Sequence, residues 1–161
     1  MPPNGSRAGD ELVLERIFKA PVALVWKAWT EPEHLVAWWG PKHHPATEMT
    51  MDLTVGGRWR ACLRSVDDGR LLWMNGIIRE IVPRKKLVFT FQWEEEGERG
   101  LETVVTVAFT EEDGSTHMVF RQVPFRSTAE REGHTEGWSS CFDRLQEYAS
   151  LHHPVGSGPG S

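Results

Sequence analysis

The sequence predicts an α+β domain in which a seven-stranded antiparallel sheet is covered by a long C-terminal helix, with two short helices after the first strand. Apolar residues alternate in seven short segments and recur at helical spacing in three others. The last six strand segments are joined by short turn signals, which favour an antiparallel meander over parallel βαβ units. The hydrophobic content of 39% in 161 residues suits one core, so we expect a single domain over residues 11–152.

The first strand is expected in LVLERIF, residues 12–18, where apolar and polar side chains alternate. Apolar residues then recur at i, i+3, i+4 and i+7 from Val22 to Trp29, which predicts a short helix. A second helix should follow at once. Thr30 and Glu33 have the spacing of a capping box at its start, and the Gly-Pro pair at 40–41 should end it.

Six further strands are expected between residues 47 and 122. They are TEMTMDL (47–53), RWRACLRS (58–65), LLWMNGIIREIV (71–82), KLVFTFQW (86–93), TVVTVAF (103–109) and THMVFRQ (116–122). Asp-Gly pairs at 68–69 and 113–114 suit tight hairpins, and EEEGERG at 94–100 is typical of a solvated turn. A sheet with one apolar face must be covered by another layer.

The closing helix is expected from about residue 127 to 151. Its apolar side consists of Trp138, Cys141, Phe142, Leu145, Tyr148 and Ala149. Gly133 and Gly137 weaken a helix, so we expect the backbone there to approach another element or a bound molecule. His134, Trp138 and Cys141 should face the sheet together because positions i, i+4 and i+7 share one side of a helix.

Composition excludes several classes of function. The net charge of −5 argues against nucleic-acid binding, which needs clustered basic residues. The sequence has no apolar run long enough to span a membrane, no glycine-rich phosphate loop and no paired-cysteine metal motif. His43 and His44 are adjacent in an extended segment, so their rings should point to opposite faces rather than chelate one ion. We therefore expect no cofactor and no metal.

The remaining expectations concern the cellular environment, the two ends of the chain and the oligomeric state. Two distant cysteines, Cys62 and Cys141, favour a reducing, cytoplasmic environment. Residues 1–10 and 153–161 are rich in Pro, Gly and Ser and should be flexible. The chain should be a monomer or a homodimer, since an exposed edge strand permits pairing but no feature demands it.

Five segments together resemble a known family. They are FKAPVALVWKAWTEPEHLVAWWGP, DLTVGGRWR, GIIREIVPRKKLVFTFQW, TVVTVAFTEEDGSTHMVFRQ and HTEGWSSCFDRLQEYAS. They are similar, in order and over about residues 11–151, to AHSA-type domains, the activator-of-heat-shock-protein-90-ATPase-like branch of the START-related helix-grip (SRPBCC) superfamily. The resemblance implies a curved sheet gripping the C-terminal helix, with a cavity between them closed at one mouth by the short helices. Members of the superfamily include lipid and polyketide binders, cyclases and part of a chaperone activator.

The resemblance gives the eight tryptophans a candidate role, because large planar side chains line pockets for aromatic or lipid-like ligands. They equally suit a filled core. The methionines in our candidate set suit either an adaptable wall or ordinary packing. The candidate ligand-binding residues are Trp39, Met49, Met51, Trp59, Trp93, Met118, His134, Trp138 and Cys141.

Three functions follow from these residues. We favour a non-enzymatic domain that binds a small apolar ligand of aromatic, acyl or polyketide-like type. The alternatives are a cofactor-free cyclase or hydrolase with His134 as acid or base, and a partner that stimulates a chaperone ATPase. An inward arginine would orient a carboxylate or phenolate ligand. Sequence alone does not fix the facing of Arg60, Asn75, Arg79 and Glu102.

Overall fold

The computed structural model describes residues 11–94 and 102–152. The predicted flexible ends and most of the predicted turn at 94–100 lie outside the described residues. Within them, seven strands and three helices follow the predicted order, which confirms the α+β fold class.

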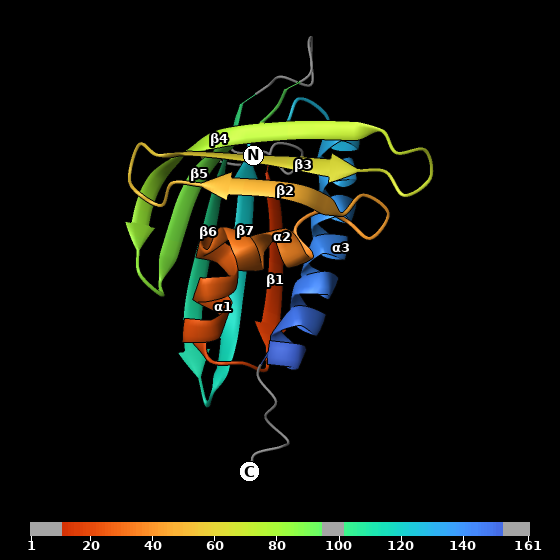
Figure 1. Ribbon diagram of the computed structural model, residues 1–161. Coiled ribbons are helices and arrows are strands. Elements are labelled where there is room, and N and C mark those ends of the chain that lie inside the picture. The colour runs from red at the N-terminus through yellow and green to blue at the C-terminus, as the bar shows by residue number, and fades with distance from the viewer. Residues whose placement is uncertain (1–10, 95–101, 153–161) are drawn as a thin grey trace.

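All seven strands belong to one open antiparallel sheet, with the order β1-β7-β6-β5-β4-β3-β2 (Figure 1). The strands are β1 (Leu12–Phe18), β2 (Ala46–Met51), β3 (Arg58–Arg64), β4 (Leu71–Val82), β5 (Lys86–Trp93), β6 (Thr103–Glu112) and β7 (Ser115–Val123). Asp113 and Gly114, with φ of 53° and 79°, form the predicted two-residue hairpin between β6 and β7.

The sheet is strongly curved, so that β2, β3 and β4 cross above β6, β7 and β1 in Figure 1. The register of β4 against β5 shifts between Ile78 and Glu80, an irregularity that bends a strand. Nearby, a Cβ on Gly76 would overlap the Thr90 carbonyl oxygen, which accepts the Trp59 indole N–H at 2.9 Å. Glycine is therefore required where β4 and β5 come this close.

The three helices are α1 (Val22–Thr30), α2 (Pro32–Trp38) and α3 (Thr128–His152). The predicted capping box at the start of α2 is wrong. Thr30 is still the last residue of α1, and its hydroxyl donates to the Trp26 carbonyl at 2.8 Å instead of capping the next helix. Glu31 occupies the N-cap position of α2 without a side-chain hydrogen bond. None of the helices in the described ranges is long and apolar enough to cross a bilayer.

The helices pack on the concave face of the sheet and share one core with it (Figure 1). Trp29 of α1, Trp38 of α2 and Phe142 of α3 are at most 1% exposed, and their rings are mutual neighbours. Arg16 of β1 fixes α3 from the side, since its guanidinium donates to Asp143 and to Ser139. The sheet thus grips α3 as predicted.

Candidate functional site

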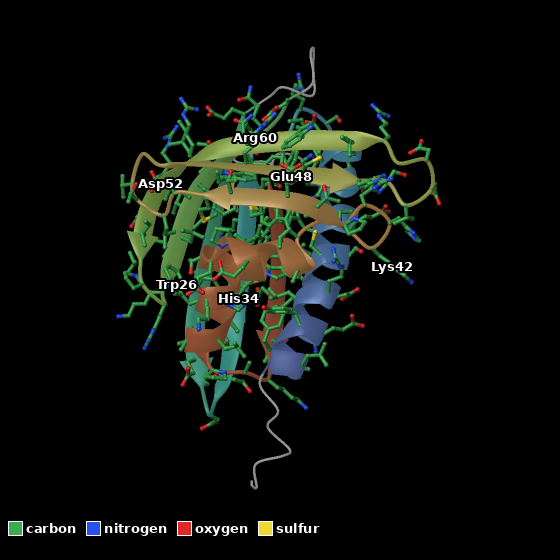
Figure 2. All side chains as sticks on the ribbon, viewed as in Figure 1. Trp26, His34, Lys42, Glu48, Asp52 and Arg60 are labelled. Carbon is green, nitrogen blue, oxygen red and sulfur yellow. The ribbon has the colours of Figure 1, made fainter. Side chains whose placement is uncertain are left out.

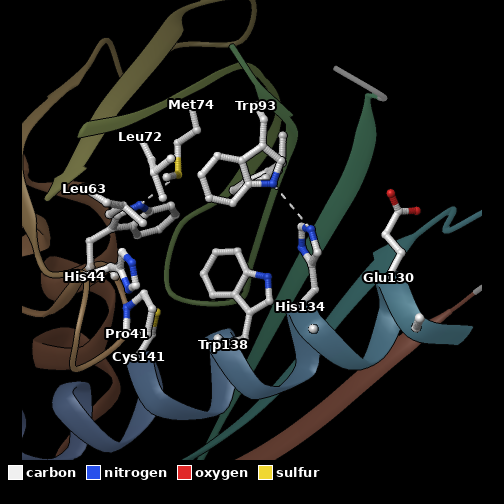
Figure 3. Close-up of a pocket in the computed structure, with 16 residues that line it drawn as sticks. Pro41, His44, Leu63, Leu72, Met74, Trp93, Glu130, His134, Trp138 and Cys141 are labelled. Carbon is white, nitrogen blue, oxygen red and sulfur yellow. Dashed lines mark hydrogen bonds between the residues drawn. The ribbon is translucent and has the colours of Figure 1, made fainter. Parts of the chain in front are cut away.

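A cavity of about 420 Å³ lies between the first half of α3 and strands β3, β4 and β5, and it opens at the surface (Figure 3). The sheet contributes Leu63, Leu72, Met74, Phe91 and Trp93; the loop after α2 contributes Trp39, Gly40, Pro41 and His44; and α3 contributes Ala129, Glu130, Gly133, His134, Gly137, Trp138 and Cys141. Most of these side chains are apolar, and four carry large aromatic rings.

Two glycines of α3 leave gaps in the helix side of the wall, next to His134 and Trp138. A Cβ built on Gly133 or on Gly137 would meet no atom within 4 Å. The expected approach of another protein element to these glycines is therefore absent in the described structure, and both residues border the open cavity instead. Each glycine lowers the stability of the helix relative to alanine. In α3 the missing side chains keep space open in the cavity.

A chain of buried polar groups fixes the orientation of Trp138. Its indole N–H donates to the Gln122 side-chain oxygen at 2.8 Å, and the Gln122 amide donates to Thr103 Oγ1 at 2.8 Å. The Thr103 hydroxyl in turn donates to the Phe91 carbonyl. Because buried polar groups are costly unless paired, this chain holds the indole in one position.

His134 forms the wall at the end of the cavity nearest the start of α3. The Trp93 indole N–H donates to His134 Nε2 at 3.4 Å, as the dashed line in Figure 3 shows. The imidazole also lies beside the rings of Phe91 and Phe125. Nε2 accepts this bond only in the tautomer of the neutral imidazole that has its proton on Nδ1.

Two further ionisable groups of the wall, Cys141 and Glu130, differ in charge. Burial raises the pKa of the Cys141 thiol to about 12, so this group is a protonated, unreactive wall atom. Partial burial by itself raises the pKa of Glu130. Hydrogen bonds from the backbone N–H and guanidinium of Arg126, with the positive charge of that guanidinium, outweigh this and leave the Glu130 pKa below its usual value. Glu130 is therefore ionised at neutral pH.

The loop that follows α2 forms the opposite end of the cavity and is bound to α3. Arg144 donates to the carbonyls of Trp39 and Gly40 at 3.0 and 2.7 Å, and the Lys42 backbone N–H donates to Ser140 Oγ at 2.8 Å. Gly40 has a φ of +92°, which favours glycine at this sharp turn. The loop brings the half-buried His44 into the wall.

Five of the nine candidate ligand-binding residues line this cavity, and four do not. Trp39, Trp93, His134, Trp138 and Cys141 are in its wall. Trp59 and Met118 are buried in the core, and Met49 and Met51 pack half-buried against it. Sequence reasoning missed His44, Leu63, Leu72, Met74 and Phe91 as wall residues. Phe91 could have been found, because it alternates with Trp93 on the same face of β5.

The four strand residues whose facing the sequence did not determine lie away from the cavity. Arg60 is on the outer face of the sheet, where its guanidinium bonds Glu94 at 2.7 and 2.8 Å and stacks 3.8 Å from the centre of the Trp73 ring (Figure 2). Asn75 donates to the same carboxylate, and Arg79 and Glu102 are exposed. No arginine of these strands therefore orients a ligand in the cavity.

One group of potential metal ligands occurs among the described residues, outside the cavity wall. Ligand atoms of Glu31, Glu33 and His34 lie within 4.8 Å of one another at the start of α2. His34 also contacts the Tyr148 hydroxyl through Nδ1. Acidic side chains often gather in this way at a surface without binding an ion, so we assign no metal to them.

Comparison with known proteins identifies the family. Residues 19–150 match the family described as "Activator of Hsp90 ATPase homolog 1-like protein". The chain belongs to this family. Its architecture is consistent with the wider SRPBCC superfamily, as the sequence resemblance implied.

Solved structures from several bacteria share the AHSA1-type fold. A protein from Nitrosomonas europaea gives a TM-score of 0.78 at 22% identity, covering 93% of this chain and 100% of that one. An AHSA1 protein from Silicibacter pomeroyi gives 0.77 at 23% identity, covering 89% and 99%. A protein from Mycobacterium smegmatis gives 0.75 at 26% identity, covering 89% and 92%. No curated protein matches this sequence.

Proposed function

We propose that this AHSA1-family protein binds a small, apolar, aromatic molecule in the cavity between α3 and strands β3, β4 and β5. The observation that carries the proposal is an apolar space of about 420 Å³ with four aromatic rings in its wall. Ligand sites for small molecules typically enclose some 300–1,000 Å³ and combine an apolar lining with a few polar groups. Glu130, His134 and His44 supply the polar groups here.

The rigidity of the wall supports binding. Trp138 is fixed by Gln122, and Trp93 is hydrogen-bonded to His134. Arg144 holds the loop at the opposite end. A site formed in advance loses less conformational entropy when a ligand enters.

The enzymatic alternative has weaker support. His134 Nε2 accepts the Trp93 indole N–H, which occupies the lone pair that a general base would use. Cys141 is protonated and buried, so it does not serve as a nucleophile. Stimulation of a chaperone ATPase rests on the family description alone and stays a prediction.

Isothermal titration calorimetry with 2-naphthol tests the proposal. We expect saturable binding with one site per chain. Gly137→Phe should abolish it, because the new ring enters the open space beside Gly137. Glu136→Phe, at an exposed position one residue away, is the matched control and should bind as the wild type does. Absence of binding to the wild type, or equal binding by both variants, would count against this site.

A further inference from the structure

We infer that the aromatic ligand of this cavity carries one positively charged group on its apolar ring system. The cavity should select an aromatic molecule with an ammonium group over the same molecule with a carboxylate. This inference rests on the proposed function and adds the charge of the ligand to it.

The first support is the distribution of charge around the wall. Among the residues that the structure describes, Glu130 is the only formally charged side chain of the lining, and no described lysine or arginine contributes to it. Two nearby cations are already engaged outside it. Arg126 bonds Glu130 and has 41% of its side chain exposed, where water screens its charge. Arg144 donates to the backbone carbonyls of the loop after α2.

The second support is that none of the three indole N–H groups of the wall is available to a ligand. Trp138 donates to Gln122 at 2.8 Å, Trp93 to His134 at 3.4 Å, and Trp39 to the Met74 sulfur at 3.4 Å. The indole N–H groups that would stabilise a bound carboxylate are therefore all occupied by the protein. Among the described wall residues, this leaves chiefly the imidazoles of His44 and His134 as side-chain donors, and a buried anion that is incompletely paired is disfavoured.

The third support is the aromatic character of the wall itself. The ring faces of Trp39, Phe91, Trp93 and Trp138 carry negative electrostatic potential, to which a cation is attracted over distances up to about 6 Å. At the end of the cavity where α3 begins, Glu130 adds a negative charge, which the guanidinium of Arg126 partly offsets. An ammonium group held over these rings would be attracted by the ring faces and, at a longer distance, by Glu130 beyond His134 (Figure 3).

The test compares three molecules that share a naphthalene ring. They are 2-naphthylmethylamine, which is a cation at pH 8, neutral 2-naphthol and anionic 2-naphthylacetate. Calorimetric titration at pH 8 keeps the measurement above the range in which histidines ordinarily take up a proton. We expect the cation to bind about tenfold more tightly than the anion, as suits a partly desolvated cation–π site. Equal affinity, or tighter binding of the anion, would overturn the inference while leaving the proposed function intact. Failure of all three to bind would overturn both.

A charge-removing variant locates the selectivity. Glu130→Gln should reduce the preference for the cation by about threefold, whereas Glu132→Gln, two residues away with a mostly exposed side chain, should leave it unchanged. Glutamine retains an acceptor for the Arg126 backbone N–H, so the start of α3 is preserved. A preference that is the same in Glu130→Gln and in the wild type would contradict the role given to Glu130.

Discussion

The two halves of α3 face the same sheet but enclose different interiors. In the C-terminal half, Phe142 and Leu145 are completely buried and contribute to a solid core with Trp29 and Trp38. In the N-terminal half, the positions toward the sheet include Gly133 and Gly137, and a cavity remains.

The difference shows what decides whether aromatic residues fill a core or line a pocket. Tryptophans occur in both regions, with Trp29 packed tightly and Trp93 at the edge of open space. What changes is that the α3 side of the cavity includes two residues without side chains, Gly133 and Gly137, beside His134 and Trp138. Large side chains on the helix close the interior, and glycines keep it open.

The largest expected effect comes from shortening a leucine to alanine, once in the solid core and once at the cavity. Leu145→Ala removes a completely buried side chain from the solid half and should cost about 2–5 kcal/mol of unfolding free energy. Leu72→Ala removes a half-buried side chain that already borders the cavity and should cost less than about 1.5 kcal/mol. Urea unfolding measures both. Equal costs would show that the two halves are equally well packed.

A smaller effect is expected when a methyl group is added where the structure has no room. Gly76→Ala should destabilise the protein by about 1–3 kcal/mol, because its Cβ overlaps the Thr90 carbonyl and displaces the Trp59 hydrogen bond. Thermal unfolding measures the loss. A stability unchanged from the wild type would mean that β4 and β5 separate at no cost, contrary to the close approach described here.

A glycine-to-alanine substitution beside the cavity should change the unfolding free energy in the opposite direction. Gly137→Ala should stabilise the protein by about 0.5–1 kcal/mol, since alanine favours the helix and its methyl group meets open space. The affinity for 2-naphthol should fall in the same variant because the cavity shrinks. Urea unfolding and calorimetry provide the two measurements. A destabilised Gly137→Ala protein would imply that this region is as tightly packed as the surroundings of Gly76.

The smallest effect is expected on the outer face of the sheet, which contrasts with both interior regions. The hydrogen bond from Arg60, followed by that from Asn75, lowers the pKa of Glu94. Because the ionised form is favoured in the folded state, this contribution is present at neutral pH and disappears as the pH falls below about 4. Glu94→Gln should therefore cost less than about 1 kcal/mol at pH 7, and the cost should shrink as acid protonates Glu94. A destabilisation by Glu94→Gln that is larger in acid than at pH 7 would contradict this pH dependence.

The sequence predicted the fold well because its signals are local. Alternation, helical spacing and Asp-Gly turns located all seven strands and three helices, and the periodicity of α3 placed His134, Trp138 and Cys141 on one side. The predicted capping box was wrong because Thr30 belongs to the preceding helix, where its hydroxyl donates to the Trp26 carbonyl.

The cavity was predictable only in part, because it depends on distances between segments that are far apart in the sequence. Trp59 and Met118 alternate like wall residues but are covered by the core, whereas His44 reaches the wall through the Gly40 turn. Arg144, on the polar side of α3, positions that turn by binding its carbonyls. No pattern within a single segment reports these contacts.

A crystal structure of the protein with bound 2-naphthol tests the central claim most directly. The account predicts density for the naphthalene ring beside Gly137, between the indoles of Trp93 and Trp138, with the surrounding core unchanged. Density only at the outer surface, or a Trp93 ring collapsed into the space beside Gly137, would contradict it.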